Sequence, residues 1–145
     1  MYINIKKLHD KAKLPFRATQ GSAGADLFAC IDADIVVSPQ ERVLIPIGIA
    51  IEFDNPEVGA FIFPRSSLSS KFGISLANCV GVIDSDYRGE IKVPVINYSN
   101  EPYTIHCGER IAQMVILPVI LPDFAEVDEL TETERADGGF GSTGI

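Results

Sequence analysis

Alternating apolar side chains between Arg42 and Phe53 restrict the fold of this chain more than any other feature. Every odd position after Arg42 in this run is apolar: Val43, Ile45, Ile47, Ile49, Ile51 and Phe53. Successive side chains of a β-strand point to opposite faces, so a period of two places all of these residues on one face. The run therefore predicts a long strand whose apolar face is turned toward a core.

Shorter runs of the same character predict further strands, separated by turns that are rich in Gly, Pro, Asn and Asp. The expected strands cover residues 3–7, 25–29, 35–37, 59–63, 91–95 and 103–106. Only the segment from Ser66 to Phe72 has a helical character. With 145 residues and 46% apolar composition, the chain predicts a single all-β domain, either a sandwich or a jelly roll.

The run from Ile111 to Leu121 breaks the alternation, because it is apolar on both faces. A strand with two apolar faces needs a cover on each side. Two interpretations stay open: this is a central strand of the core, or part of it faces another subunit.

The formal net charge of −8 argues against nucleic acid as a partner, because duplex binding depends on many lysines and arginines that neutralise phosphates. No apolar run approaches the roughly 18 residues of a membrane span, and the N-terminal residues lack the apolar stretch of a signal peptide. We expect a soluble, intracellular protein without a membrane partner. Cys30, Cys79 and Cys107 are odd in number and form no CxxC pair, so we expect reduced, buried thiols.

The segment from Gly81 to Val93 places two carboxylates and a tyrosine in a tight hairpin turn between two apolar runs. If the first run stays extended into the turn, Asp84 and Asp86 share a face, which is an arrangement suited to a general base. The alternative is a structural Asp-Ser-Asp turn, whose side chains bond to nearby backbone amides.

The end of the chain, residues 135–144, reads Arg-Ala-Asp-Gly-Gly-Phe-Gly-Ser-Thr-Gly. Glycines allow successive backbone amides to converge on an anion, although many such tails are only mobile chain ends. Together with the turn above and with Ala23–Leu27, Pro64–Leu68 and Gly108–Val115, this tail resembles, in order and spacing, the five motifs of the trimeric deoxyuridine triphosphate nucleotidohydrolases (dUTPases).

The resemblance spans about residues 3 to 144 and implies a fold and an assembly. Residues 1–134 would form a distorted, β-clip-like jelly roll, and residues 135–145 an arm that closes the active site. The family forms homotrimers in which the active sites are shared between subunits.

The same resemblance implies that the substrate is dUTP, which is hydrolysed to dUMP and pyrophosphate. Asp84 matches the aspartate that activates a water for attack on the α-phosphorus, and Asp86 supports the turn. The implied cofactor is Mg²⁺, held by the three substrate phosphates and by water, so no metal ligand is expected from the protein.

The resemblance also implies which residues contact the uracil and the deoxyribose of the substrate. In the family, main-chain groups that line the uracil pocket imitate a base-pairing partner, and the residues that resemble this segment are Asn78, Gly81, Val82, Ile83, Asp84 and the backbone near Lys92. Tyr87 resembles the tyrosine beneath the deoxyribose that leaves no room for a 2′-hydroxyl. Without the family, Tyr87 would be a strand aromatic packed across the hairpin.

The implied phosphate contacts come from the other motifs. Arg65, Ser66 and Ser67 match a Pro-Arg-Ser motif, although many relatives carry glycine in place of Ser67. Gln113 matches a glutamine near the phosphates or their waters, and Asp26 holds Arg65 by an ion pair. In the tail, Phe140 resembles a ring that closes over uracil, and the clamp on the outer phosphates resembles Arg135, Gly141, Ser142 and Thr143.

Two other functions fit parts of the pattern. A deoxycytidine triphosphate deaminase resembles dUTPases in fold, but its relatives usually lack this tyrosine turn and the Gly-Phe-Gly tail. Deamination of the zinc type is disfavoured, because His9 and His106 stand alone and no PCxxC segment is present. A non-enzymatic regulator that binds a nucleotide on the same fold is the second alternative.

Overall fold

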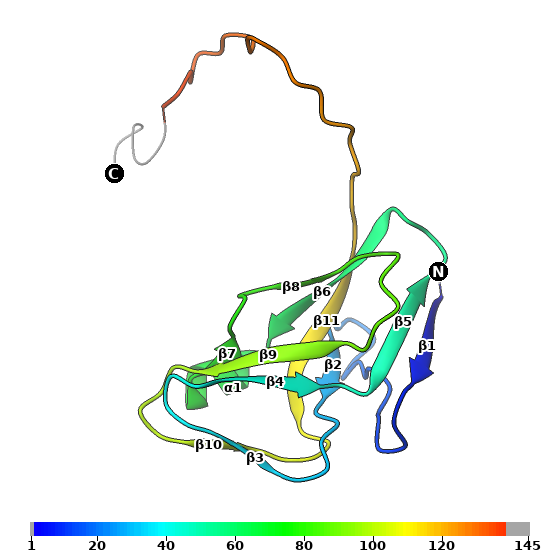
Figure 1. Cartoon of the computed structure of the whole chain (residues 1–145), viewed down its shortest axis with the longest axis vertical. Coiled ribbons are helices and arrows are strands. Elements are labelled where there is room, and N and C mark those ends of the chain that lie inside the picture. The colour runs from blue at the N-terminus through cyan, green and yellow to red at the C-terminus, as the bar shows by residue number, and fades with distance from the viewer. Residues whose placement is uncertain (1, 139–145) are drawn as a thin grey trace.

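The computed structural model describes residues 2–138, and strands dominate this part of the chain (Figure 1). The single helix among them, α1 (Ser66–Phe72), has the predicted bounds, and no helix in residues 2–138 has the length and apolarity needed to cross a membrane. The strands are β1 (Ile3–Lys7), β2 (Ala25–Phe28), β3 (Ile35–Val37), β4 (Arg42–Pro46), β5 (Ile49–Phe53), β6 (Val58–Pro64), β7 (Ile74–Leu76), β8 (Gly81–Ile83), β9 (Lys92–Asn97), β10 (Tyr103–Ile105) and β11 (Arg110–Pro118).

The strands form two larger sheets and two strand pairs, all antiparallel. One sheet has the order β2-β11-β6-β8 and the other β4-β9-β7, while β1 pairs with β5 and β3 with β10. In β11, Met114 lies opposite Ala25 of β2 and Ile62 of β6, so this strand is covered on both edges. Within the run 111–121, β11 is thus a central strand of its sheet, whereas Leu117, Ile120 and Leu121 are exposed, so the interpretation that part of the run faces another subunit stays a prediction.

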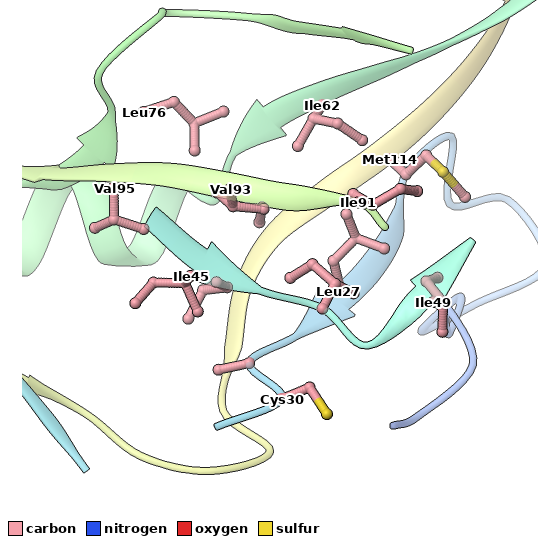
Figure 2. Close-up of a cluster of buried hydrophobic side chains, with 14 of the residues drawn as sticks. Leu27, Cys30, Ile45, Ile49, Ile62, Leu76, Ile91, Val93, Val95 and Met114 are labelled. Carbon is pink, nitrogen blue, oxygen red and sulfur yellow. The ribbon is translucent and has the colours of Figure 1, made fainter. Parts of the chain in front are cut away.

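The core lies between the sheets, and each sheet contributes side chains to it. Figure 2 shows Leu27 and Met114 from one sheet and Ile45 and Val93 from the other, gathered in one cluster. All four are at most 4% exposed, and burying such a side chain stabilises the fold by about 1.5–3 kcal/mol. The predicted all-β jelly roll is confirmed.

The predicted long strand over residues 42–53 is wrong in one respect, because the chain turns a corner at Gly48. Gly48 has φ +72°, and the two halves of the run, β4 and β5, pair with different strands. Ile47 and Ile49 on either side of the corner are both fully buried. The alternation continues across the corner because both halves turn their odd positions inward, so the pattern alone could not reveal it.

The segment from Gly81 to Val93 is not the predicted hairpin. Strand β8 pairs with β6, whereas β9 pairs with β4 and β7, so the connection leads from one sheet to the other. A turn begins directly at Asp84, whose carbonyl accepts a hydrogen bond from the Tyr87 amide at 3.1 Å. The run therefore does not stay extended as far as Asp86, and the condition for Asp84 and Asp86 to share a face is not met.

Strand β7 was missed in the sequence. It has only three residues and directly follows Gly73, whose left-handed backbone (φ +68°) ends α1.

The prediction of three buried thiols is wrong for two of them. All three cysteines are free, but only Cys30 is buried, because Cys79 and Cys107 lie in exposed connections between strands. Burial raises the pKa of the Cys30 thiol, which keeps it protonated.

We predict that Gly48→Ala lowers the free energy of unfolding by roughly 3 kcal/mol, which combines left-handed strain with overpacking. The added Cβ would lie 2.6 Å from the Cys30 Sγ and 2.9 Å from the Ala12 Cβ. Gly21→Ala is the matched control, because no atom lies within 4 Å of its added Cβ. Urea denaturation at equal protein concentration measures the free energy of unfolding of both variants. Equal stability of the two would contradict the tight packing and the left-handed backbone described at Gly48.

Candidate active site

Many of the residues singled out from the sequence line one of two separate clefts. The tyrosine cleft, of about 420 Å³, is lined by Leu44, Val82, Ile83, Asp84, Tyr87, Glu90 and Lys92. The arginine cleft, of about 340 Å³, is lined by Ala18, Ser22, Ala23, Gly24, Asp26, Arg65, Ser66, Ser67, Arg110 and Gln113. The two clefts share no lining residue.

In the tyrosine cleft, a carboxylate and an aromatic ring stand beside an open strand edge. Strand β8 is the last strand of its sheet, so one side of its backbone at Val82 and Ile83 can hydrogen-bond to a ligand. Asp84 is exposed, and its carboxylate makes no hydrogen bond within residues 2–138. Such a carboxylate can accept a proton from a bound water.

Tyr87 forms a wall of this cleft although its side chain is not buried. It is 42% exposed, and its hydroxyl donates a hydrogen bond to the Glu90 carbonyl at 3.0 Å. Asn78 and Gly81 lie next to each other just outside the lining: a Cβ at Gly81 would be 3.6 Å from the Asn78 Nδ2.

The arginine cleft is organised by a carboxylate that is 8% exposed, Asp26 on β2. Its Oδ1 accepts a hydrogen bond from the Arg65 Nε at 2.8 Å, as the expected ion pair requires, and its Oδ2 lies 3.1 Å from an Arg110 guanidinium nitrogen. Two guanidinium groups on one carboxylate leave a net positive charge in a protein whose formal net charge is −8. The cleft is therefore suited to an anion.

Gln113 and the start of α1 complete this cleft. The Gln113 Nε2 donates to the Pro64 carbonyl at 3.0 Å, which fixes the side chain across β6 and β11. Gly24 allows it this position, because a Cβ there would lie 2.4 Å from the Gln113 Oε1. Ser66 and Ser67, at the start of α1, are exposed on the wall of the cleft.

The two clefts lie far apart in one chain. Ile83 pairs with Ala60 on β6, so Asp84 lies level with Gly59, which is six residues from Arg65. At about 3.3 Å per residue, this separates Asp84 from Arg65 by about 20 Å along the strand. Within one copy, Asp84 and Arg65 are therefore too far apart to contact the same phosphate.

Other predicted residues are not brought into either cleft. Asp86 lies on a neighbouring hollow beside Val119 and Leu121. Its carboxylate makes no hydrogen bond within residues 2–138, so the expected support of the turn through this side chain is wrong. Arg135 lies in an exposed turn, where its Nε donates to the Gly138 carbonyl at 2.9 Å. Phe140, Gly141, Ser142 and Thr143 are outside the described residues.

Several lining residues received no individual role from the sequence: Leu44 and Glu90 in the tyrosine cleft, and Ala18, Ser22, Ala23, Gly24 and Arg110 in the arginine cleft. Leu44 carried a usable signal, because an apolar residue at an even position of the 42–53 run has to face outward. Arg110 and Glu90 lie inside the quoted segments Gly108–Val115 and Gly81–Val93, but their contacts could not be predicted, because these depend on which strands lie side by side. Among residues 2–138, no three His, Cys, Asp or Glu side chains converge as metal ligands.

Comparisons with known proteins agree with this geometry. A family model described as dUTPase matches residues 10–144. A deoxyuridine 5'-triphosphate nucleotidohydrolase of Desulfitobacterium hafniense is 57% identical over 94% of this chain and 91% of that protein. One of Hydrogenobaculum sp. is 53% identical over 100% of this chain and 99% of that protein.

A solved structure is similar over almost its full length. It is the structure of a mutant Staphylococcus bacteriophage 80alpha dUTPase with dUpNHpp. This structure matches the chain with a TM-score of 0.89 at 27% sequence identity, over 99% of each chain. On these matches, the chain belongs to the dUTPase family.

Proposed function

We propose that this protein hydrolyses dUTP to dUMP and pyrophosphate, with Asp84 as the general base. The observation that carries the proposal is the tyrosine cleft, where an exposed carboxylate, an aromatic wall and an open strand edge surround one cavity. The relatives that span nearly the whole chain are named deoxyuridine 5'-triphosphate nucleotidohydrolase, which supports the same substrate here.

In the proposed reaction, the Asp84 carboxylate takes a proton from a water that attacks the α-phosphorus. The bond between the α-phosphorus and the bridging oxygen breaks on the opposite side, and pyrophosphate leaves with the bond electrons. Because the protein makes no covalent bond to the phosphate, its contribution is alignment and charge stabilisation. The turn that begins at Asp84 holds the base at the mouth of the cleft.

The tyrosine cleft recognises the uracil and the deoxyribose of dUTP. The backbone at Val82 and Ile83 offers fixed donors and acceptors to the edge of uracil, and backbone groups cannot rotate to suit cytosine. The ring of Tyr87 packs against the deoxyribose where a 2′-hydroxyl would stand. A site that excludes a group by a wall in this way discriminates by steric fit.

The arginine cleft binds the triphosphate through Arg65, Ser66, Ser67 and Gln113, with Asp26 holding Arg65 in position. Mg²⁺ supplies further neutralisation of the phosphate charge when it is bound. The residues present fit such an ion: Mg²⁺ commonly keeps several waters and binds through substrate phosphates, so it needs no cage of protein carboxylates.

The proposed site requires more than one copy of the chain. Asp84 has to reach the α-phosphorus directly or through one water, while Arg65 in the same copy is about 20 Å away along the strands. The arginine cleft of a second copy therefore completes the site. Exposed apolar side chains after β11, at Ile120 (91% exposed), Phe124 (96%) and Leu130 (87%), support contact with another chain. A homotrimer, as in the family, satisfies both requirements.

The chain, in this proposal, consists of a body, residues 1–134, and an arm, residues 135–145. Figure 1 shows the chain leaving the sheets after β11. Arg135, Phe140, Gly141, Ser142 and Thr143 would cover a bound substrate, with Phe140 over uracil and the others at the outer phosphates. Closure of this kind excludes water from the reactants.

Pyrophosphate release from each deoxynucleoside triphosphate in the presence of Mg²⁺ tests the proposed function. Release from dUTP alone is expected. Ammonia release from dCTP would instead indicate a deaminase, and binding of dUTP without turnover would indicate a regulator.

We predict that Asp84→Asn lowers kcat by about a thousandfold or more, because an amide cannot take a proton from water. The affinity for a non-hydrolysable dUTP analogue should stay within about tenfold, since the amide fills the same space. Asp54→Asn, an exposed residue outside both clefts, is the matched control. Stopped-flow assays and calorimetry measure the two quantities, and normal turnover by the variant would remove Asp84 from this role.

Tyr87→Ala should mainly weaken discrimination against UTP, by about tenfold or more in the ratio of kcat/KM for dUTP to that for UTP. The variant loses a steric wall and keeps the base. Competition assays with both nucleotides give the ratio directly. If the ratio does not change, the sugar is recognised elsewhere.

A chain that ends at Glu134 should fold and assemble normally but lose about two orders of magnitude in kcat/KM for dUTP. Arg135, Ala136 and Asp137 are exposed, so their removal leaves the core intact. Size-exclusion chromatography and melting temperature without ligand should match the full chain. Full activity of the truncated protein would show that the arm has no part in the site.

A further inference from the structure

Tyr87 is held in place by contacts rather than by burial. Its hydroxyl donates to the Glu90 carbonyl at 3.0 Å, and its ring lies directly over Gly89. A Cβ at Gly89 would lie 2.3 Å from the Tyr87 hydroxyl oxygen and 2.5 Å from its Cζ. The direction of the ring therefore depends on where the backbone of Gly89 and Glu90 lies.

The Glu90 side chain ties this backbone to the core. One carboxylate oxygen accepts a hydrogen bond from the Gly48 amide at 3.1 Å, and the other lies 3.6 Å from the Lys92 Nζ. Gly48 is buried at the corner between β4 and β5, where no side chain fits. Next to it, Ile91 bonds through its backbone to Ile47 and Ile49 at 3.0 and 2.9 Å.

We propose that Glu90 is a positioning residue for the sugar: it anchors the carbonyl on which the Tyr87 hydroxyl rests, and so sets discrimination between deoxyribose and ribose. This inference rests on the proposed hydrolysis of dUTP. Glu90 lines the tyrosine cleft, but its carboxylate is bonded to Gly48 and paired with Lys92, so it acts through Tyr87 and does not need to touch the substrate.

The reach of the side chain, and not its charge, is what the proposal requires. Glu90→Gln keeps the length and an oxygen acceptor for the Gly48 amide, whereas Glu90→Asp keeps the charge but is one methylene shorter. The ratio of kcat/KM for dUTP to that for UTP should stay within about twofold in Glu90→Gln and fall about tenfold in Glu90→Asp and Glu90→Ala.

A double-mutant cycle tests whether the effect passes through the tyrosine hydroxyl. Tyr87→Phe removes the bond to the Glu90 carbonyl and should lower the ratio as Glu90→Ala does. Once the hydroxyl is gone, Glu90→Ala should add little further loss, because the two residues act as one unit. Losses that multiply in the double variant would overturn the proposal.

Glu41→Ala is the control for a purely structural effect. The Glu41 carboxylate also accepts a backbone hydrogen bond, from the Ser38 amide at 2.7 Å, and it lines neither cleft. Its loss should lower the melting temperature without changing the ratio. If Glu90→Ala fails to fold, the comparison of Glu90→Asp with Glu90→Gln decides the question.

The outcomes separate this inference from the function on which it rests. A wild-type protein that releases no pyrophosphate from dUTP would overturn both. An active wild type with the same ratio in folded Glu90→Asp or Glu90→Ala would overturn only the role of Glu90.

Discussion

The corner at Gly48 is the constraint on which both the fold and the tyrosine cleft depend. Its left-handed backbone turns the chain from β4 into β5, and its carbonyl accepts a hydrogen bond from the Leu8 amide at 2.8 Å. Its amide, in turn, donates to the Glu90 carboxylate. Because Cys30 and Ala12 fill the space where a side chain would lie, the corner cannot shift without disturbing the core. A single buried residue thus connects the packing of the sheets to the wall of the cleft.

Local patterns made most strands predictable, while pairing between distant strands was not. The bounds of β1, β3 and α1 agree with the ranges 3–7, 35–37 and 66–72 that were predicted from local sequence. The partner of β8 did not, because a short apolar run fits either neighbour, and only the packed molecule decides that β6 takes it. The corner at Gly48 escaped for a related reason: alternation records which side chains face the core, not the direction of the chain.

The residues of the candidate site were likewise predictable only in part. Asp84, Tyr87 and Arg65 could be named from motifs that lie in short stretches of sequence. The second guanidinium on Asp26 could not, because Arg110 reaches it only through the pairing of β11 with β2. The role proposed for Glu90 likewise depends on its hydrogen bond with Gly48, which lies 42 positions earlier in the chain. Residues that support a site through long-range contacts are therefore harder to predict than residues in its motifs.

The charge of the protein explains why the proposed site needs a local cluster of arginines. A chain with a formal net charge of −8 repels a triphosphate at long range, so attraction has to come from a local excess of arginine. That excess lies about 20 Å from Asp84 along the strands, which keeps the guanidinium groups away from the base in the single chain. In the proposed assembly, the two clefts of different copies adjoin, and the phosphates of the substrate occupy the arginines while Asp84 stays available to water.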